Sequence, residues 1–318
     1  MSRVWRFLPL LFVLLALKVS AQDVKSWLDR MNDAVENLNY EGTFVHVLDG
    51  DAETLHIVHR NAAGSIGEKI SSLDGAGREI VRRDQEVQCV LPDQRIVLME
   101  APRGPSSPLG SALPNYSELL EEYYDFVTVQ KGQVARRDTQ IISIKPRDDY
   151  RYGYALWLDR ETAMPLKAQV RDETGAVVEQ ILFTAFEVVD SIPESSLLPT
   201  IDTTGFTWIR PHDVEPGDSA NPDVAWRASS LPQGFQLSVA RQSSIGGAEH
   251  PVDHLVYSDG LATVSVFVAD PQTDLVEGFS RFGSTNAYSL TVSGRKVTAM
   301  GEVPRQTVQR IATSLGAK

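Results

Sequence analysis

The sequence predicts a mainly β protein with α+β character, folded as two domains. Its 318 residues are enough for two domains of ordinary size. Short segments rich in Val, Ile, Thr and Phe alternate with turn residues along most of the chain, which is typical of antiparallel sheets. Residues 209–222 (IRPHDVEPGDSANP) interrupt this pattern with three prolines and one glycine, and we interpret them as a semi-rigid linker.

The N-terminus predicts export. In residues 1–21 (MSRVWRFLPLLFVLLALKVSA), Arg3 and Arg6 precede an apolar run, and Val19-Ser20-Ala21 places small residues before a cleavage site. This is the pattern of a secretory signal peptide cleaved after about Ala21. An uncleaved anchor is the alternative, although the apolar run is shorter than the ~20 residues that span a bilayer.

Charge and cysteine content exclude several classes of function. The formal net charge is −12 and becomes −15 once the three basic residues of the signal peptide are removed. Residues 223–318 are neutral, so the whole excess of negative charge lies in residues 22–222. This balance argues against nucleic-acid binding. The single cysteine, Cys89, cannot form an internal disulfide or a Cys-rich metal site. Its apolar neighbours predict a buried thiol, with a reactive thiol as the alternative.

The first domain, residues 22–208, begins with an amphipathic helix. Asp23 is its expected N-cap, and one face carries Val24, Trp27, Leu28, Met31, Val35 and Leu38. Strands are expected at 42–48, 54–60, 66–73, 78–83, 86–91, 94–99, 125–130, 133–145, 153–158, 165–172 and 176–189. A Pro-rich excursion at 101–115 and a short helix from Ser117 to Tyr124 interrupt them. Together these elements predict an unclosed antiparallel β-barrel with a helix closing one side.

The second domain, residues 223–318, is a smaller α+β unit. Strands are expected at 235–242, 252–258, 261–269, 286–292 and 295–302. A terminal helix follows, with Pro304 in its first turn, an apolar face of Val308, Ile311 and Leu315, and Gly316 as its end.

No cluster of residues predicts catalysis, a metal site or a cofactor. Glu53, His56 and His59 are spaced by three, which places neighbours on opposite faces of a strand. His250 and His254 are separated by Pro251 and have no third ligand nearby. Asp148 and Asp149 are adjacent carboxylates in a charged stretch, so a solvated corner with local ion pairs is the expectation. An enzyme on a barrel scaffold stays open only as an alternative that lacks a nucleophile motif.

Aromatic residues are densest around residues 123–157 and allow two interpretations. Tyr152 and Tyr154 share one face of a strand, which fits either a well-packed sheet or an aromatic-lined cavity for an acyl chain. The residues alone do not separate the two.

Four motifs carry a resemblance to a known family. They are Asp149-Tyr-Arg-Tyr-Gly-Tyr-Ala-Leu-Trp-Leu-Asp159 followed by Pro165-Leu-Lys167; Leu231-Pro-Gln-Gly-Phe235; His254-Leu-Val-Tyr-Ser-Asp-Gly-Leu-Ala262 running into Val264-Ser-Val-Phe267; and Gly301-Glu-Val-Pro304. In this order, and across nearly the whole mature chain, they resemble the MucB/RseB family of periplasmic regulators, the pseudomonad type more than the enteric type.

The resemblance implies a LolA/LolB-like first domain with a lipid-sized cavity, and a periplasmic location. It implies binding to the periplasmic domain of a transmembrane anti-sigma factor (MucA- or RseA-like), which shields that domain from site-1 proteolysis. Lipid or lipopolysaccharide would promote release. A lipid or lipoprotein carrier is the alternative function, and a homodimer is an open alternative to a monomer.

Two sets of contact residues are proposed under this resemblance, although residues of these types in strands belong to a core more often than to a contact surface. The lipid set is Phe44, Ile57, Tyr152, Tyr154 and Phe183, from the first sheet. The partner set is Arg241, His254, Tyr257 and Phe267, from the second domain.

Overall fold

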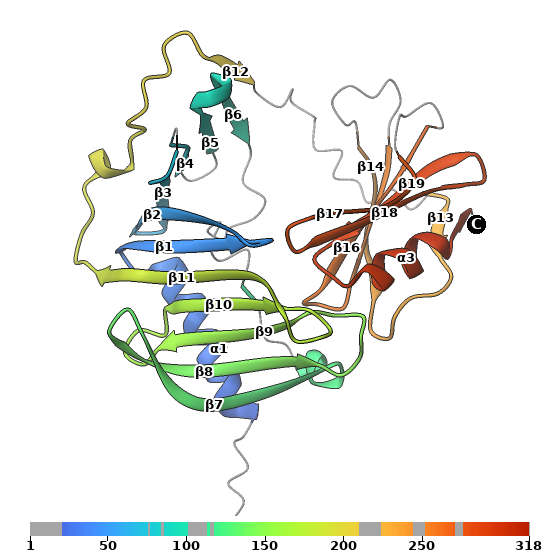
Figure 1. The fold of residues 1–318 in the computed structure, drawn as a ribbon, viewed down its shortest axis with the longest axis horizontal. Helices are drawn as coiled ribbons and strands as arrows, with labels where there is room; N and C mark the ends of the chain where they lie inside the picture. Colours follow the sequence, from blue (N-terminus) through green and yellow to red (C-terminus); the bar gives the residue numbers. More distant parts are fainter. Residues whose placement is uncertain are drawn as a thin grey trace, which may run out of the picture.

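The protein folds around two large, mainly antiparallel sheets that lie side by side (Figure 1). The computed structural model describes residues 21–317 except 76, 84–85, 101–112, 115–117, 210–223, 244–251 and 271–275. The expected signal peptide, most of the Pro-rich excursion, most of the linker and His250 therefore lie outside the described residues.

The larger sheet has twelve strands in the order β12-β6-β5-β4-β3-β2-β1-β11-β10-β9-β8-β7. In chain order they are β1 (Tyr40–Leu48), β2 (Asp51–Ala62), β3 (Ser65–Ser72), β4 (Glu79–Arg83), β5 (Glu86–Leu91), β6 (Ile96–Glu100), β7 (Tyr124–Val134), β8 (Arg137–Pro146), β9 (Gly153–Asp159), β10 (Pro165–Arg171), β11 (Val177–Val188) and β12 (Thr207–Ile209). All neighbours are antiparallel except β12 and β6. Since β7 and β12 remain edges, the prediction of an unclosed antiparallel barrel is confirmed.

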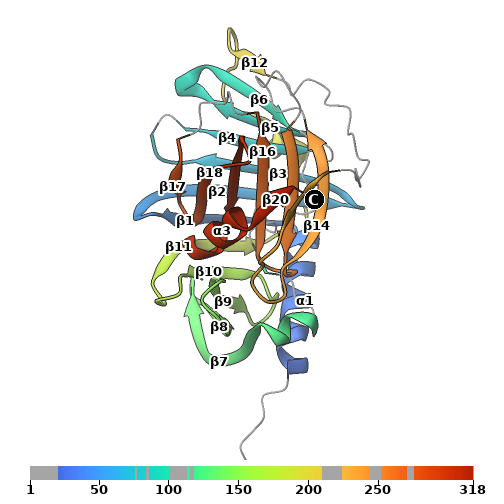
Figure 2. The same ribbon diagram turned by 90° about the vertical axis from the view of Figure 1, so that its right-hand side faces the viewer.

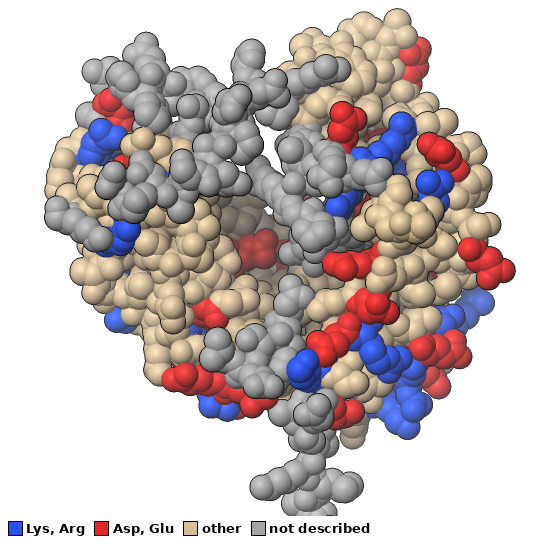
Figure 3. Space-filling view, turned by 180° about the vertical axis from the view of Figure 1, so that it is seen from behind, with Lys and Arg blue, Asp and Glu red and all other residues tan. Residues whose placement is uncertain are grey.

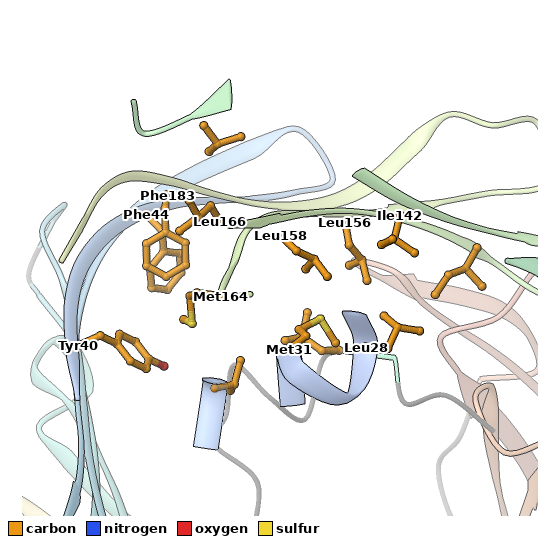
Figure 4. Packing of buried hydrophobic residues seen from close by; sticks show 14 of the residues in the cluster. Leu28, Met31, Tyr40, Phe44, Ile142, Leu156, Leu158, Met164, Leu166 and Phe183 are labelled. Carbon is orange, nitrogen blue, oxygen red and sulfur yellow. The ribbon is translucent and has the colours of Figure 1, made fainter. Parts of the chain in front are cut away.

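Helix α1 (Ala21–Asn37) fills the hollow side of this sheet. Leu28 and Met31 are fully buried, and they face strand side chains such as Leu156 and Leu158, while Phe44 and Phe183 lie farther along the same core near Met164 (Figure 4). The stripe of apolar residues along one helical face thus covers the apolar face of the strands, and burial of each large side chain contributes about 1.5–3 kcal/mol. Among the described connections, three contain short 3₁₀ helices: η1 (Pro92–Gln94), η2 (Glu118–Glu122) and η3 (Glu194–Leu197).

The second domain has a six-stranded sheet, a terminal helix and a two-stranded ribbon. The sheet runs β14-β15-β16-β19-β18-β17, from β14 (Gln236–Ser243), β15 (Val252–Ser258), β16 (Thr263–Ala269), β17 (Gly278–Phe282), β18 (Thr285–Val292) and β19 (Arg295–Gly301). Helix α3 (Arg305–Thr313) buries Val308 and Ile311 against one face. The ribbon pairs β13 (Trp226–Ala228) with β20 (Leu315–Ala317).

The two domains meet so that the smaller sheet stands beside the strand ends of the larger one (Figure 1). Helix α3 covers the face of the smaller sheet that is turned away from the larger domain (Figure 2). The opposite face is turned toward it. Seen from behind, the molecular surface is hollowed between the two lobes (Figure 3).

Several local expectations were wrong. Asp23 is not the N-cap, because it lies within α1, whose described part starts at Ala21. Gly316 does not end the terminal helix: α3 stops at Thr313, and Gly316 pairs with Arg227 in the ribbon. The expected short helix near residue 120 is present, but as a 3₁₀ helix. The edge strand β17 was missed because its five residues carry no long apolar pattern.

Candidate functional site

A small apolar pocket opens on the hollow side of the larger sheet, next to the second domain. Its lining consists of Leu113, Pro114, Tyr154, Leu156, Ala168, Gln169, Val170, Glu179, Ile181 and Glu302. The free volume is about 20 Å³, which is room for about one water molecule. An acyl chain can therefore enter only if the walls move. One wall, Glu302, belongs to the second domain.

The rim of this pocket is acidic. Glu179 Oε1 hydrogen bonds with His46 Nε2 at 2.9 Å, and Glu179 Oε2 accepts a hydrogen bond of 2.7 Å from Ser284 of the second domain. Burial alone would raise the pKa of Glu179, but these hydrogen bonds outweigh it and lower the pKa. Partial burial raises the pKa of Glu302, and the charge of Glu179 raises it further. Burial also raises the pKa of the Tyr154 hydroxyl.

The five residues proposed for lipid contact occupy three different places. Phe44, Ile57 and Phe183 are buried in the core under α1, where the two phenyl rings lie 5.3 Å apart. Tyr154 is half-buried and lines the pocket. Tyr152 is buried at the domain interface, where its hydroxyl accepts a hydrogen bond from Asn286. Of the five, only Tyr154 borders the pocket.

Three of the four residues proposed for partner contact share one face of the smaller sheet. Arg241 pairs with His254 across β14 and β15, and the His254 ring stacks on Phe267 with centroids 4.5 Å apart. All three are half-buried and lie on the face turned toward the larger domain. Tyr257 points the other way into the core, where its hydroxyl accepts a hydrogen bond from the backbone N–H of Ala228.

Arg151 is the residue that sequence reasoning missed. The solvated corner was expected at Asp148 and Asp149, and these two carboxylates are indeed partly or fully exposed, but Arg151 beside them has no exposed surface. Its Nε lies 2.5 Å from Oδ2 of Asp259, an equally buried carboxylate of the second domain. The corner is therefore part of the interface between the domains.

The four motifs that carried the family resemblance meet at this interface. Arg151 comes from the first, Gln233 and Phe235 from the second, Asp259 from the third, and Glu302, which lines the pocket beside first-domain residues, from the fourth. Their order in the sequence gave no hint of this meeting. The charged stretch before a run of tyrosines was the one local pattern that could have pointed to it.

No group of three or more metal-ligating side chains occurs among the described residues. His59, one of the spaced histidines, is buried against Tyr40, and this burial lowers its pKa although its hydrogen bond with the carbonyl of Leu38 acts in the opposite direction. No helix within the described part of the chain is long and apolar enough to cross a membrane.

An unclosed half-barrel joined through a buried interface to a small α+β domain defines a two-domain binding protein. The chain matches the models of the MucB/RseB N-terminal domain over residues 23–201 and of the MucB/RseB C-terminal domain over residues 220–316. It therefore belongs to the MucB/RseB family. The sigma factor AlgU regulatory protein MucB of Pseudomonas aeruginosa is 33% identical over 304 residues, 93% of this chain and 91% of that protein.

Solved structures of the family match along nearly the whole chain. The structure of the P. aeruginosa MucA/MucB complex matches with a TM-score of 0.71 at 30% identity, covering 93% of this chain and 99% of that one. A crystal structure of MucB matches with a TM-score of 0.62 at 29% identity, covering 94% and 99%. Identity and coverage are nearly equal, so the two structures differ in how closely their backbone arrangement matches this chain.

Proposed function

We propose that this protein binds the periplasmic domain of a transmembrane anti-sigma factor and shields it from the first proteolytic cleavage. It would thereby restrain the envelope-stress sigma factor. The observation that carries the proposal is the match, along both domains, to a MucB structure solved with MucA. The relatives are named as sigma-factor regulatory proteins, and we extend that role to this chain.

The location and the division of labour follow from this proposal. We propose that residues 1–21 are a signal peptide cleaved after about Ala21, which delivers residues 22–318 to the periplasm. Within them, residues 22–208 would sense lipid, residues 209–222 would link the domains, and residues 223–318 would supply the main partner surface. The half-buried face of Arg241, His254 and Phe267 supports the last assignment, because it offers a cation and two stacked rings on one surface.

We further propose that lipid or lipopolysaccharide lowers the affinity for the anti-sigma factor by acting at the pocket beside Tyr154. That pocket lies next to Ser284 and Glu302 of the second domain, so widening it for an acyl chain would disturb domain contacts. Binding at one site would then oppose binding at the other by the same coupling free energy, typically about 1–3 kcal/mol. Phe44, Ile57 and Phe183 would contact lipid only if α1 moved away.

A titration tests the function. Residues 22–318 are titrated by calorimetry with the periplasmic domain of the cognate anti-sigma factor, alone and with lipopolysaccharide, and the stoichiometry also reports a homodimer. Micromolar or tighter binding that lipopolysaccharide weakens is the expected result. Binding that ignores lipopolysaccharide would remove the lipid-release step. Absence of binding, together with transfer of labelled lipid between vesicles, would replace the regulator with the lipid carrier.

A further inference from the structure

Arg151 reaches from the first domain into a closed cage formed by both domains. Its guanidinium pairs with Asp259 and Asp148 and donates a hydrogen bond to the carbonyl of Gln233. Its carbon Cζ lies 4.9 Å from the ring centre of Tyr123, 5.7 Å from that of Tyr124 and 5.0 Å from that of Phe235. Asp259, Gln233 and Phe235 belong to the second domain. A fully buried arginine is rare, and this one spans a domain boundary.

Both carboxylate oxygens of Asp259 accept hydrogen bonds. Its Oδ1 accepts the backbone N–H groups of Leu261 and Ala262 within its own turn, at 2.9 and 2.7 Å. Its Oδ2 accepts hydrogen bonds from Arg151 and from the hydroxyl of Tyr124. Both oxygens of Asp259 and all three side-chain nitrogens of Arg151 are therefore engaged in one geometry. A buried pair of this kind contributes little net stability but specifies one arrangement, because a small displacement leaves buried charges unpaired.

Further residues of the first domain also contact the second domain. The backbone carbonyl of Tyr150 accepts a hydrogen bond from the hydroxyl of Thr307. The ring and the hydroxyl of Tyr150 both contact Arg310 of α3. A second zone lies at the other side, where Asp49 accepts the backbone N–H of Gly283 and pairs with Arg281. Both side chains of the Asp49–Arg281 ion pair are partly exposed, so water screens that pair more than the buried pair of Arg151 and Asp259.

We infer that Arg151 is a positioning residue for partner binding: it fixes the two domains in the arrangement that the anti-sigma factor recognises. The closer overall backbone match to the MucA-bound relative than to the MucB structure, with TM-scores of 0.71 and 0.62, supports this, because the domain arrangement that Arg151 holds here accompanies the closer match. The inference rests on the proposed function for its partner. Arg151 itself is buried and need not touch that partner.

Two matched pairs of variants test the role. Arg151→Gln removes the caged charge, whereas Arg147→Gln removes an arginine of the same loop whose pair with Asp125 is about half exposed. Gly234→Ala provides a second route without changing charge, because an added Cβ would lie 2.5 Å from the Tyr123 ring. Its control is Gly175→Ala, which has the same φ of +84° and no neighbour within 4 Å.

The measurements are affinity for the anti-sigma periplasmic domain and the distance distribution between spin labels placed on exposed sites of the two domains. Arg151→Gln and Gly234→Ala are expected to broaden the distances and to weaken binding at least tenfold, chiefly through faster dissociation. Arg151→Lys keeps the charge without the planar fork and should recover part of the affinity. Both controls should behave like wild type.

The inference is overturned if Arg151→Gln and Gly234→Ala leave affinity unchanged, or if they weaken binding while the interdomain distances stay narrow. If Arg151→Gln does not fold, as judged by circular dichroism, Gly234→Ala decides alone. If the wild-type protein does not bind the anti-sigma domain, the proposed function fails. The spin-label distances then still test whether Arg151 fixes the arrangement of the two domains. Unchanged distances in Arg151→Gln and Gly234→Ala would refute that role.

Discussion

The side-chain amide of Asn286 donates a hydrogen bond of 2.8 Å to the hydroxyl of Tyr152 and thereby joins the second domain to the first. The same amide nitrogen donates to the carbonyl of Val303 at 2.8 Å, so Asn286 holds together two segments of its own domain as well. Both side chains are almost completely buried. Removal of the Tyr152 hydroxyl therefore breaks one of these hydrogen bonds, whereas removal of the Asn286 amide breaks both.

Replacement of Tyr152 by Phe should cost about 0.5–1.5 kcal/mol in unfolding free energy, because the amide of Asn286 keeps its bond to Val303. Asn286→Ala should cost more, about 1–3 kcal/mol, since it leaves a buried hydroxyl and a buried carbonyl without their donor. Urea denaturation of both variants measures the order. Tyr288→Phe is the control, as the Tyr288 hydroxyl has no hydrogen bond with any described residue. A larger cost for Tyr152→Phe than for Asn286→Ala would contradict the assignment.

The pair of Arg137 and Asp159 predicts a pH-dependent part of stability. Arg137 donates two hydrogen bonds, of 3.1 and 3.0 Å, to the buried carboxylate of Asp159. Burial on its own would raise the pKa of Asp159, but the hydrogen bonds from Arg137 and Thr162 outweigh it and lower the pKa. A carboxyl whose pKa is lowered by folding stabilises the protein above its unfolded pKa, and that stability is lost as the pH falls through the folded pKa.

Arg137→Gln should therefore destabilise the protein by about 2 kcal/mol at pH 7, a value reduced from that of a fully buried pair because Arg137 is partly exposed. The difference from wild type should shrink once the pH falls below about 4, the unfolded pKa of Asp. Denaturation at pH 7 and pH 3 checks this. Arg147→Gln, which removes an exposed pair, should cost less than about 1 kcal/mol at either pH. An equal loss for Arg137→Gln at both pH values would refute the linkage.

The sequence allowed the longer strands to be predicted within a few residues because alternation and turn residues are local signals, whereas the short strands β12, β13, β17 and β20 were missed. Strands β8 and β9, for instance, were expected at 133–145 and 153–158 and lie at Arg137–Pro146 and Gly153–Asp159. Helix α1 was equally clear from its apolar stripe. The unclosed form of the sheet followed from the number of short strands and the single covering helix.

The domain interface could not be predicted in the same way. Arg151 stands in a stretch of charged residues, and such stretches are usually solvated. Its burial depends on Gln233 and Asp259, which are 82 and 108 residues away in the chain. Pairing at that distance leaves no local pattern. Tyr257 is a different case, because it lies three residues after His254 in β15 and alternation alone puts the two side chains on opposite faces. The register of β14 then places Arg241 opposite His254.

Filling the pocket should uncouple lipid from partner binding. Ala168 lines the pocket, and its free volume of about 20 Å³ has no room for the larger side chain of Leu. Ala168→Leu should cost about 1–3 kcal/mol through overpacking, while affinity for the anti-sigma domain stays within twofold and its weakening by lipopolysaccharide is abolished. Tyr154→Ala, which enlarges the pocket, should strengthen the lipopolysaccharide effect. Calorimetric titrations measure both.

The exposed Ala185 provides the control for this pair, because Ala185→Leu adds the same atoms outside the pocket and should change neither stability nor lipid response appreciably. If Ala168→Leu retained the full lipid response, lipid would have to act elsewhere. The core under α1 would then be the next place to examine, through Phe44 and Phe183.

Substitutions on opposite faces of the smaller sheet should have different effects, one on stability and the other on partner binding. Tyr257→Phe removes the acceptor of the Ala228 N–H in the core, so it should cost about 1–3 kcal/mol in unfolding free energy and leave partner affinity unchanged. Phe267→Ala removes the half-buried ring that stacks on His254, on the face turned toward the larger domain. It should cost about 1 kcal/mol or less in stability but weaken partner binding about tenfold or more, as expected for an aromatic contact residue. Urea denaturation and calorimetry on the same two variants give both quantities. If Phe267→Ala bound the anti-sigma domain as tightly as wild type, the partner surface would have to lie on another part of the second domain, because Arg241 and His254 share the face that this ring helps to form.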